Sequence, residues 1–91
     1  MINIRLNFNQ NRSFNGYVTN HDGYVMMTVS TKSTLDLVQM INNLRNEYVE
    51  NVQCVVNDYN GEPHLIPMSG SSDDIRNALF NVIREAEGVP A

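Results

Sequence analysis

Polar and apolar residues alternate along much of the first third of the chain. Residues 2–8 place an aliphatic or aromatic side chain at every second position, with Asn or Arg between them. This period of two predicts a β-strand with one buried side and one solvent-facing side. A second strand is predicted over 14–19, and a third over 24–30, where β-forming residues dominate. The Asn-His-Asp-Gly sequence at 20–23 predicts a hairpin turn between these two strands, because glycine adopts positive φ at no steric cost.

The period changes to three or four residues over 33–48, which predicts an amphipathic helix. Ser33 is expected at the N-cap, where its hydroxyl accepts a backbone hydrogen bond, and Asp36 follows three residues later, as in a capping box. One side of this helix is expected to pack on the core. The apolar stripe on that side consists of Leu37, Met40, Ile41, Leu44 and Tyr48.

The second half of the chain repeats this order of strand, turn and strand. Residues 52–57 alternate again, and the Asp-Tyr-Asn-Gly sequence at 58–61 predicts a second hairpin turn. The returning segment, 62–68, contains Pro63 and Pro67. Because proline cannot donate a hydrogen bond to a ladder, this segment is expected to be an edge strand or partly irregular.

A second helix is predicted after this segment. Ser71 and Asp74 form another Ser-x-x-Asp start, and Gly88 ends the helical pattern. The apolar stripe of this helix consists of Ile75, Ala78, Leu79, Val82, Ile83 and Ala86. Residues 89–91 are expected to form a frayed C-terminal tail.

The two halves also match residue by residue. With a constant offset of 38, residues 13–47 align with residues 51–85 without a gap, and six of the 35 positions are identical. About two identities are expected by chance at ordinary residue frequencies. The identical pairs are Val18/Val56, Gly23/Gly61, Ser33/Ser71, Asp36/Asp74, Asn43/Asn81 and Glu47/Glu85. We therefore predict two β-β-α pseudo-repeats, related by a pseudo-twofold axis.

These elements predict a single α+β domain over 1–88, in the order β-β-β-α-β-β-α. A mainly antiparallel sheet would carry both helices on one face. The other face would meet water or a partner and would present Asn3, Arg5, Asn7, Asn15, Tyr17 and Thr19. Residues 2–8 contain no proline, so self-pairing or β-augmentation is expected there if this strand lies at an edge.

Charge and cysteine content narrow the classes of function. The net charge is −4 and the six basic residues are spread along the chain, which argues against nucleic-acid binding because that function needs clustered cations. The single cysteine, Cys54, excludes an internal disulfide and gives no zinc spacing. The first residues interleave Asn and Arg, unlike a signal peptide, and no apolar run approaches the ~20 residues that cross a bilayer. A cytoplasmic protein without membrane contact is expected.

Candidate catalytic and metal-binding residues are few. His21 and Asp22 could act as a general base, but the aligned turn at 58–61 keeps the turn sequence without this chemistry. His64 has no partners at metal-ligand spacing, and Cys54 alternates with valines on a predicted inward side. No Gly-rich phosphate loop is present. We therefore expect no catalytic residue, no metal and no cofactor.

Tyrosine is enriched at protein interfaces because it combines a large, rigid contact area with a polar tip. The residues expected to bind a partner are Tyr17, Tyr24, Tyr59, Arg5 and His21. The first hypothesis is a small non-catalytic cytosolic interaction module, a regulator, adaptor or inhibitor that binds another protein and forms a homodimer. Small domains of this class are common among accessory proteins of phages and mobile elements, an analogy of size and class alone.

Two other hypotheses remain open. The polar sheet face could bind single-stranded nucleic acid, with Tyr17 stacking on a base and Arg5 and Arg12 contacting phosphates, although the net acidity counts against it. The chain could also be a small enzyme whose site, containing His21 and His64, assembles across a dimer interface.

Overall fold

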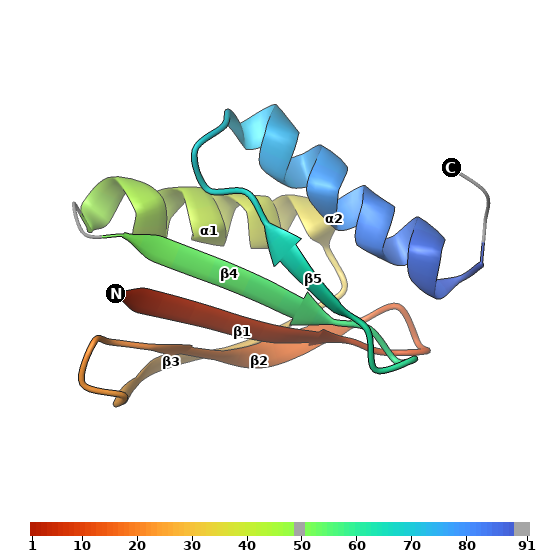
Figure 1. Cartoon of the computed structure of the whole chain (residues 1–91), viewed down its shortest axis with the longest axis horizontal. Helices are drawn as coiled ribbons and strands as arrows, with labels where there is room; N and C mark the ends of the chain where they lie inside the picture. The colour runs from red at the N-terminus through yellow and green to blue at the C-terminus, as the bar shows by residue number, and fades with distance from the viewer. Residues whose placement is uncertain (49–50, 89–91) are drawn as a thin grey trace.

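A computed structural model describes residues 1–48 and 51–88. The elements in chain order are β1 (Ile2–Phe8), β2 (Phe14–Thr19), β3 (Val25–Thr31), α1 (Thr34–Glu47), β4 (Val52–Asn57), β5 (Pro63–Ile66) and α2 (Ser72–Ala86) (Figure 1). The predicted order β-β-β-α-β-β-α is confirmed. The tail predicted at 89–91 lies outside the described residues.

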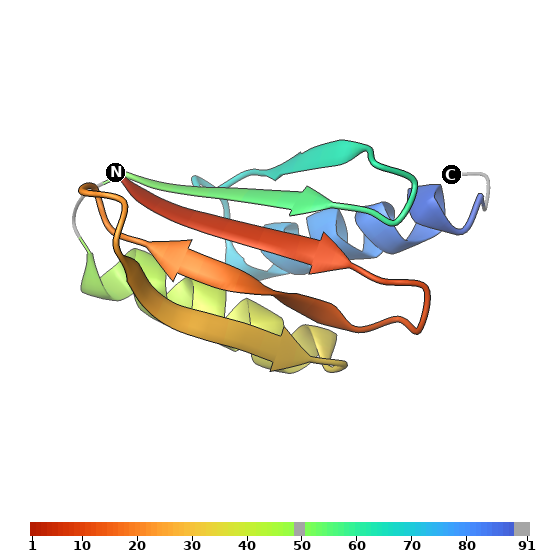
Figure 2. The same cartoon turned by 90° about the horizontal axis from the view of Figure 1, so that it is seen from below.

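The five strands form one mixed sheet in the order β3-β2-β1-β4-β5. Three of the neighbouring pairs are antiparallel, and the pair of β1 with β4 is parallel. Both helices cover the same face of the sheet, while the other face carries no helix (Figures 1 and 2). The prediction of an α+β domain with a mainly antiparallel sheet is therefore confirmed. In the described residues, no helix is long and apolar enough to cross a membrane.

Strand β1 lies in the middle of the sheet, with β2 hydrogen-bonded on one side and β4 on the other. Self-pairing through residues 2–8 was expected only if this strand lay at an edge of the sheet, and β1 does not lie at an edge. A parallel β1–β4 pair is possible because helix α1 and the connections around it carry the chain back across the sheet. The two edges are β3 and β5, and the edge position expected for the segment with the two prolines is confirmed.

The pseudo-repeat predicted from the sequence is present in the structure. Strands β2 and β3 and helix α1 begin 38 residues before β4, β5 and α2, respectively. The strand order places the two units on opposite sides of β1, and because β2 is antiparallel and β4 parallel to β1, they run in opposite directions. A pseudo-twofold axis perpendicular to the sheet through β1 relates them.

The two hairpin turns have the same hydrogen bonds. In the first, the Asn20 Oδ1 atom accepts from the backbone N–H groups of Asp22 and Tyr24, at 2.9 and 3.0 Å. In the second, the Asp58 Oδ1 atom accepts from those of residues 60 and 62, at 2.8 and 3.0 Å. The fourth residue of each turn is a glycine with φ of +87° or +83°, a left-handed conformation that other residues rarely adopt. The turns predicted from the Asp-Gly and Asn-Gly sequences are therefore confirmed.

Both helix starts carry the predicted serine cap, but the reciprocal half of the capping box forms only at α2, because the Ser33 N–H donates to Thr31 Oγ1 at 3.0 Å instead of to Asp36. The Ser33 hydroxyl accepts a hydrogen bond from the Asp36 N–H, and Ser71 and Asp74 form a reciprocal capping box at α2. Helix α1 is also joined to the loop before α2, because Arg45 donates to the carbonyl oxygens of residues 68 and 70. These contacts fix both helices over the sheet.

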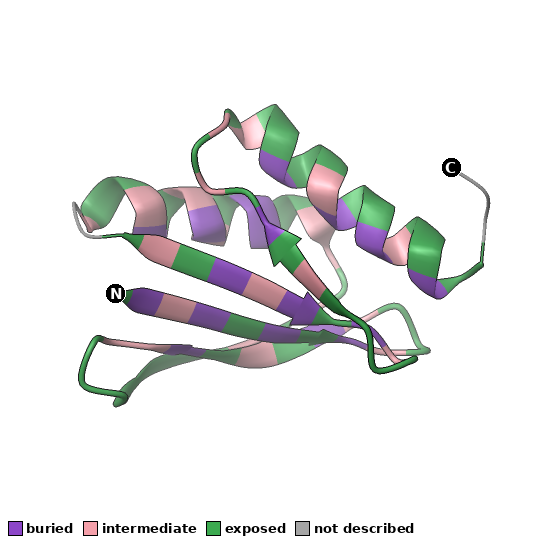
Figure 3. Ribbon diagram, viewed as in Figure 1, coloured by how far each residue is buried: buried purple, intermediate pink, exposed green. Residues whose placement is uncertain are grey.

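The core lies between the sheet and the two helices. Buried and exposed residues alternate along β1, β2 and β4, and each helix has a buried stripe toward the sheet (Figure 3). The rings of Phe8 and Phe14 pack at a centroid distance of 4.9 Å near one end of the sheet. Side chains that are fully buried include Ile4, Leu6, Val18, Ile41, Cys54, Val56, Ile75 and Leu79. The uncovered sheet face is thereby left to the alternate residues of every strand.

Candidate interaction surface

The uncovered face of the sheet carries one row of side chains that runs from edge to edge. Register pairs join Thr28 to Tyr17, Tyr17 to Arg5, Arg5 to Val55, and Val55 to Leu65. These five residues come from β3, β2, β1, β4 and β5 in turn, so every strand contributes one. We call this set the cross-sheet row.

Large side chains of the cross-sheet row are accessible on both sides of its centre. Tyr17 is 42% exposed and Leu65 is 67% exposed, so both offer apolar surface to a partner. The exposed guanidinium of Arg5 lies between them in the order of the strands. A tyrosine, an arginine and an exposed leucine are therefore placed along one flat surface.

Amide and hydroxyl side chains flank the cross-sheet row on both sides. One flanking row is Ser30, Asn15, Asn7, Asn57 and Pro63, and the other contains Val25, Thr19, Asn3 and Gln53. These positions include the polar residues that the sequence predicted for this face. A hollow of about 230 Å³ lies between β1 and β4, lined by Asn3, Ile4, Arg5, Gln53, Val55 and Asn57. The face is therefore apolar and cationic along its centre and amide-rich on either side.

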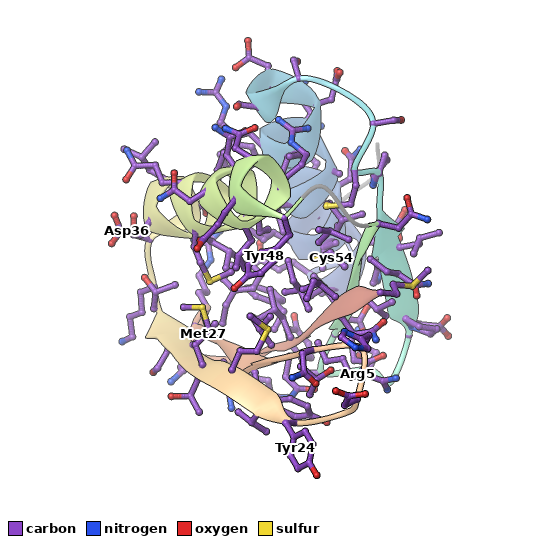
Figure 4. All side chains as sticks on the ribbon, turned by 90° about the vertical axis from the view of Figure 1, so that its left-hand side faces the viewer. Arg5, Tyr24, Met27, Asp36, Tyr48 and Cys54 are labelled. Atoms are coloured by element: carbon purple, nitrogen blue, oxygen red, sulfur yellow. The ribbon has the colours of Figure 1, made fainter. Side chains whose placement is uncertain are left out.

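The five residues predicted to bind a partner are not gathered in one place. Tyr17 and Arg5 are direct cross-strand neighbours in the cross-sheet row. Tyr24 and His21 belong to the exposed β2–β3 hairpin end, where Tyr24 points away from the molecule (Figure 4). Tyr59 is half-buried, and its ring lies 5.9 Å from that of Phe8. The structure thus brings together two of the five, and Tyr59 packs against the core.

Val55 and Leu65 complete the cross-sheet row and were missed by sequence reasoning. Each side chain points to the opposite face from its buried neighbours on the same strand, as the alternation Cys54, Val55, Val56 shows. An outward apolar residue on a half-buried strand was therefore the signal available in the sequence.

A group of three titratable side chains joins the β4–β5 hairpin to helix α2. The Nε2 atom of His64 lies 2.9 Å from Asp58 Oδ2, and its Nδ1 atom lies 3.2 Å from Glu85 Oε2. The amide of Asn60 in the same turn donates to the carbonyl oxygen of Ala86 at 3.0 Å. Both imidazole nitrogens face acceptor oxygens, so neither is free to take a proton from a third group. We interpret the group as a structural latch.

The carboxylate of Asp58 is buried and fully hydrogen-bonded. Burial by itself raises its pKa, but the hydrogen bond with His64 and the backbone N–H groups of Glu62 and Asn60 outweigh burial. The charge of His64 acts in the same direction, and the net effect holds the pKa of Asp58 below its ordinary value of 3.8. Asp58 is therefore ionised in the folded protein at neutral pH.

The other residues weighed for chemistry are set apart from this latch. His21 and Asp22 lie 3.5 Å apart with both side chains about 60% exposed, in a turn at the surface. Cys54 is fully buried on β4, and burial raises the pKa of its thiol to about 12. Over residues 1–48 and 51–88, no group of three His, Cys, Asp or Glu side chains is arranged to hold a metal ion.

Comparison with known proteins finds no family model, curated protein or solved structure that matches this chain.

Proposed function

We propose that this chain is a non-catalytic protein-interaction module, a regulator, adaptor or inhibitor that binds another protein through the uncovered face of its sheet. The cross-sheet row is the observation that carries this proposal. Tyrosine and arginine are enriched among the residues that dominate binding energy at protein interfaces, and here they are adjacent and exposed. Around them lie amide side chains, which match the polar rim of such an interface.

The chemistry of the cross-sheet row describes the partner surface that it fits. Among the described strand residues whose side chains lie on the uncovered face, Arg5 is the one that is charged. It calls for a carboxylate on the partner, because guanidinium and carboxylate form paired hydrogen bonds. Tyr17 and Leu65 call for a flat apolar area on either side of that carboxylate.

The nucleic-acid hypothesis would use the same face and is less well supported. Binding of single strands needs a positively charged groove that follows the phosphates. Arg12, the second cation considered for that role, pairs with Glu87 of the chain at 3.3 Å. A single guanidinium in the cross-sheet row offers little compensation for phosphate charge on a protein with net charge −4.

The proposal is tested by affinity capture from cells that produce the protein, after nuclease treatment. Three tagged baits are compared: the wild type, Tyr17→Ala and Phe80→Ala. Phe80 is a matched control, because it is 41% exposed on α2 while Tyr17 is 42% exposed on the sheet face. We expect the wild type and Phe80→Ala to retain the same protein partner and Tyr17→Ala to lose it.

The purified partner then gives a quantitative result. Loss of a central tyrosine is expected to raise Kd at least about tenfold, the size typical of a dominant interface residue. Equal affinity for all three baits would contradict the use of this face. Binding of a fluorescent oligo-uridine probe that Tyr17→Ala weakens, without any nuclease-resistant partner, would instead support the nucleic-acid hypothesis.

A further inference from the structure

Strand β3 forms an edge of the sheet that nothing in its own sequence protects. Its residues are Val, Met, Met, Thr, Val, Ser and Thr, with no proline and no charge. The opposite edge, β5, begins with Pro63 and is followed by Pro67, and it is only four residues long. Short length, proline, charge and β-bulges are features by which sheet edges avoid pairing with other chains. Strand β3 has only the last of these, a single bulge near its start, and its residues from Met27 to Thr31 pair regularly with β2.

The space between β3 and α1 is also incompletely filled. Met27 lies on the side of β3 that faces α1 (Figure 4), and 38% of its surface is exposed. Hollows of about 270 and 400 Å³ lie beside it. Their shared lining is Met27, Asp36 and Met40. The two methionines therefore offer apolar contacts beside β3, on the face that carries the helices, next to the carboxylates of Asp36 and Glu47.

We propose that β3 pairs antiparallel with β3 of a second copy of this chain, about a twofold axis at Thr28. In this register Thr28 lies opposite Thr28 of the second copy, and Met27 lies opposite Val29 of the second copy. Met27 and Val29 share the helix face, so these apolar side chains meet there on both sides of the axis, and the bulge near the start of β3 ends the regular pairing beyond them. Thr–Thr pairs and pairs of apolar side chains are favourable neighbours across antiparallel strands.

The neutral strand β3 and the residues at its two ends favour a second copy as the occupant. The strand itself is neutral, so its own sequence introduces no like-charge contact when it pairs with itself. Lys32 follows the strand, and exposed Tyr24 precedes it, so antiparallel pairing brings the Lys32 end of one copy against the Tyr24 end of the other. A lysine over a tyrosine ring is attractive. The two Lys32 residues stay about 27 Å apart, eight residues along the strands.

Pairing at β3 would join the two sheets into one of ten strands with all four helices on the same face. The two α1 helices would then flank the new junction, and the hollows beside Met27 would be shared between the copies. On the uncovered face, the cross-sheet row would continue from Tyr17 through Thr28 into the second copy. The dimer stands on the edge strand alone and does not depend on the proposed partner.

The test uses charge at the twofold position. Thr28 is exposed, so Thr28→Lys and Thr28→Glu should both fold, which circular dichroism checks. Sedimentation velocity and light scattering then measure the mass of each protein from low to high micromolar concentration. We expect the wild type at twice the 10.3 kDa chain mass, each variant alone at 10.3 kDa, and an equal mixture of the two variants at twice that mass again.

Leu65→Lys, on the other edge strand, is the matched control and should leave the dimer intact. A monomeric wild type over the whole concentration range would overturn the proposal. So would a dimer that both Thr28 variants leave unchanged, since pairing would then lie elsewhere. Because the readout is mass, this result is independent of whether Tyr17→Ala loses a protein partner.

Discussion

Asp58→Ala should be among the most destabilising single substitutions outside the apolar core. The side chain of Asp58 is 2% exposed and accepts three hydrogen bonds within the β4–β5 hairpin. Two come from backbone N–H groups of the turn, and the third is shared with His64 on the neighbouring strand. Alanine leaves all three donors without this acceptor, and the two turn donors then depend on water.

The expected loss follows from these contacts. Hydrogen bonds to a charged group contribute roughly 1.5–3 kcal/mol each, and removing one member of a buried ion pair costs about 3–5 kcal/mol. Because the two estimates count the same contacts in part, Asp58→Ala is expected to lower the free energy of unfolding by about 4 kcal/mol. Asp58→Asn keeps an oxygen that accepts the turn hydrogen bonds but loses the charge that faces His64. This variant is expected to lower the free energy of unfolding by about 2 kcal/mol. At roughly 0.05–0.15 kcal/mol per residue, either loss is a large share of the stability of such a chain.

The pseudo-repeat supplies a matched control. Asn20 makes the same two turn hydrogen bonds in the first hairpin, without a histidine partner and at a more accessible position. Asn20→Ala should therefore cost about 1 kcal/mol. Urea unfolding followed by circular dichroism gives the free energy of unfolding of all four proteins.

The pH dependence provides a second check with a defined sign. The folded-state pKa of Asp58 lies below its ordinary value of 3.8, so its contribution is complete above that pH and is lost as the pH falls further. The amide introduced by Asp58→Asn does not titrate, so the gap in stability between wild type and this variant should close as the medium becomes more acid. Equal losses of under about 1 kcal/mol for Asp58→Ala and Asn20→Ala would refute this account of the buried carboxylate.

Two further predictions concern the central strands. Gly16→Ala should lower the urea midpoint by the equivalent of about 2 kcal/mol or more, because an added Cβ would meet the Arg5 carbonyl oxygen and lie 2.9 Å from the Leu6 Cα atom. Gly23→Ala, in open space but at a φ of +87°, should cost about 1 kcal/mol, and the reverse order would contradict the steric argument. Cys54, with its pKa raised to about 12 by burial, should react with a disulfide reagent only after unfolding in urea; rapid labelling of the folded protein would show that the thiol is accessible.

Much of the fold could be predicted because its signals are local. Alternation along β1, β2 and β4, the two Gly-bearing turns and the two Ser-x-x-Asp helix starts each depend on a few adjacent residues. The offset of 38 then linked the two halves, and the structure begins the matching elements at that spacing. The position of β1 depended on long-range pairing, which periodicity does not encode. A strand with one polar side fits a central or an edge position equally well.

The candidate sites were less predictable, because their residues are assembled by the sheet order. Tyr17 and Arg5 were named from the sequence, yet their adjacency follows from the β1–β2 register. The latch joins His64 to Glu85 on a helix 21 residues away in the sequence, and only the folded chain brings them within 3.2 Å. A histidine between two prolines carries no sign of that contact.

The places where the two units differ explain why one edge is proposed to bind and the other is not. In the sheet, Val25 pairs with Thr19 as Pro63 pairs with Asn57, so Val25 of the first unit corresponds to Pro63 of the second. Beyond the bulge, Met27, which pairs with Val18, corresponds to His64, which pairs with Val56 and is held in the latch by carboxylates on both sides. The second unit therefore closes its outer strand with proline and ion pairs, while the first presents methionine and valine at the same positions. Turns and helix caps are shared because both units need them to fold. An unprotected edge is not needed for folding and favours association with other strands, so its retention in one unit alone is expected where that edge is occupied by a second chain.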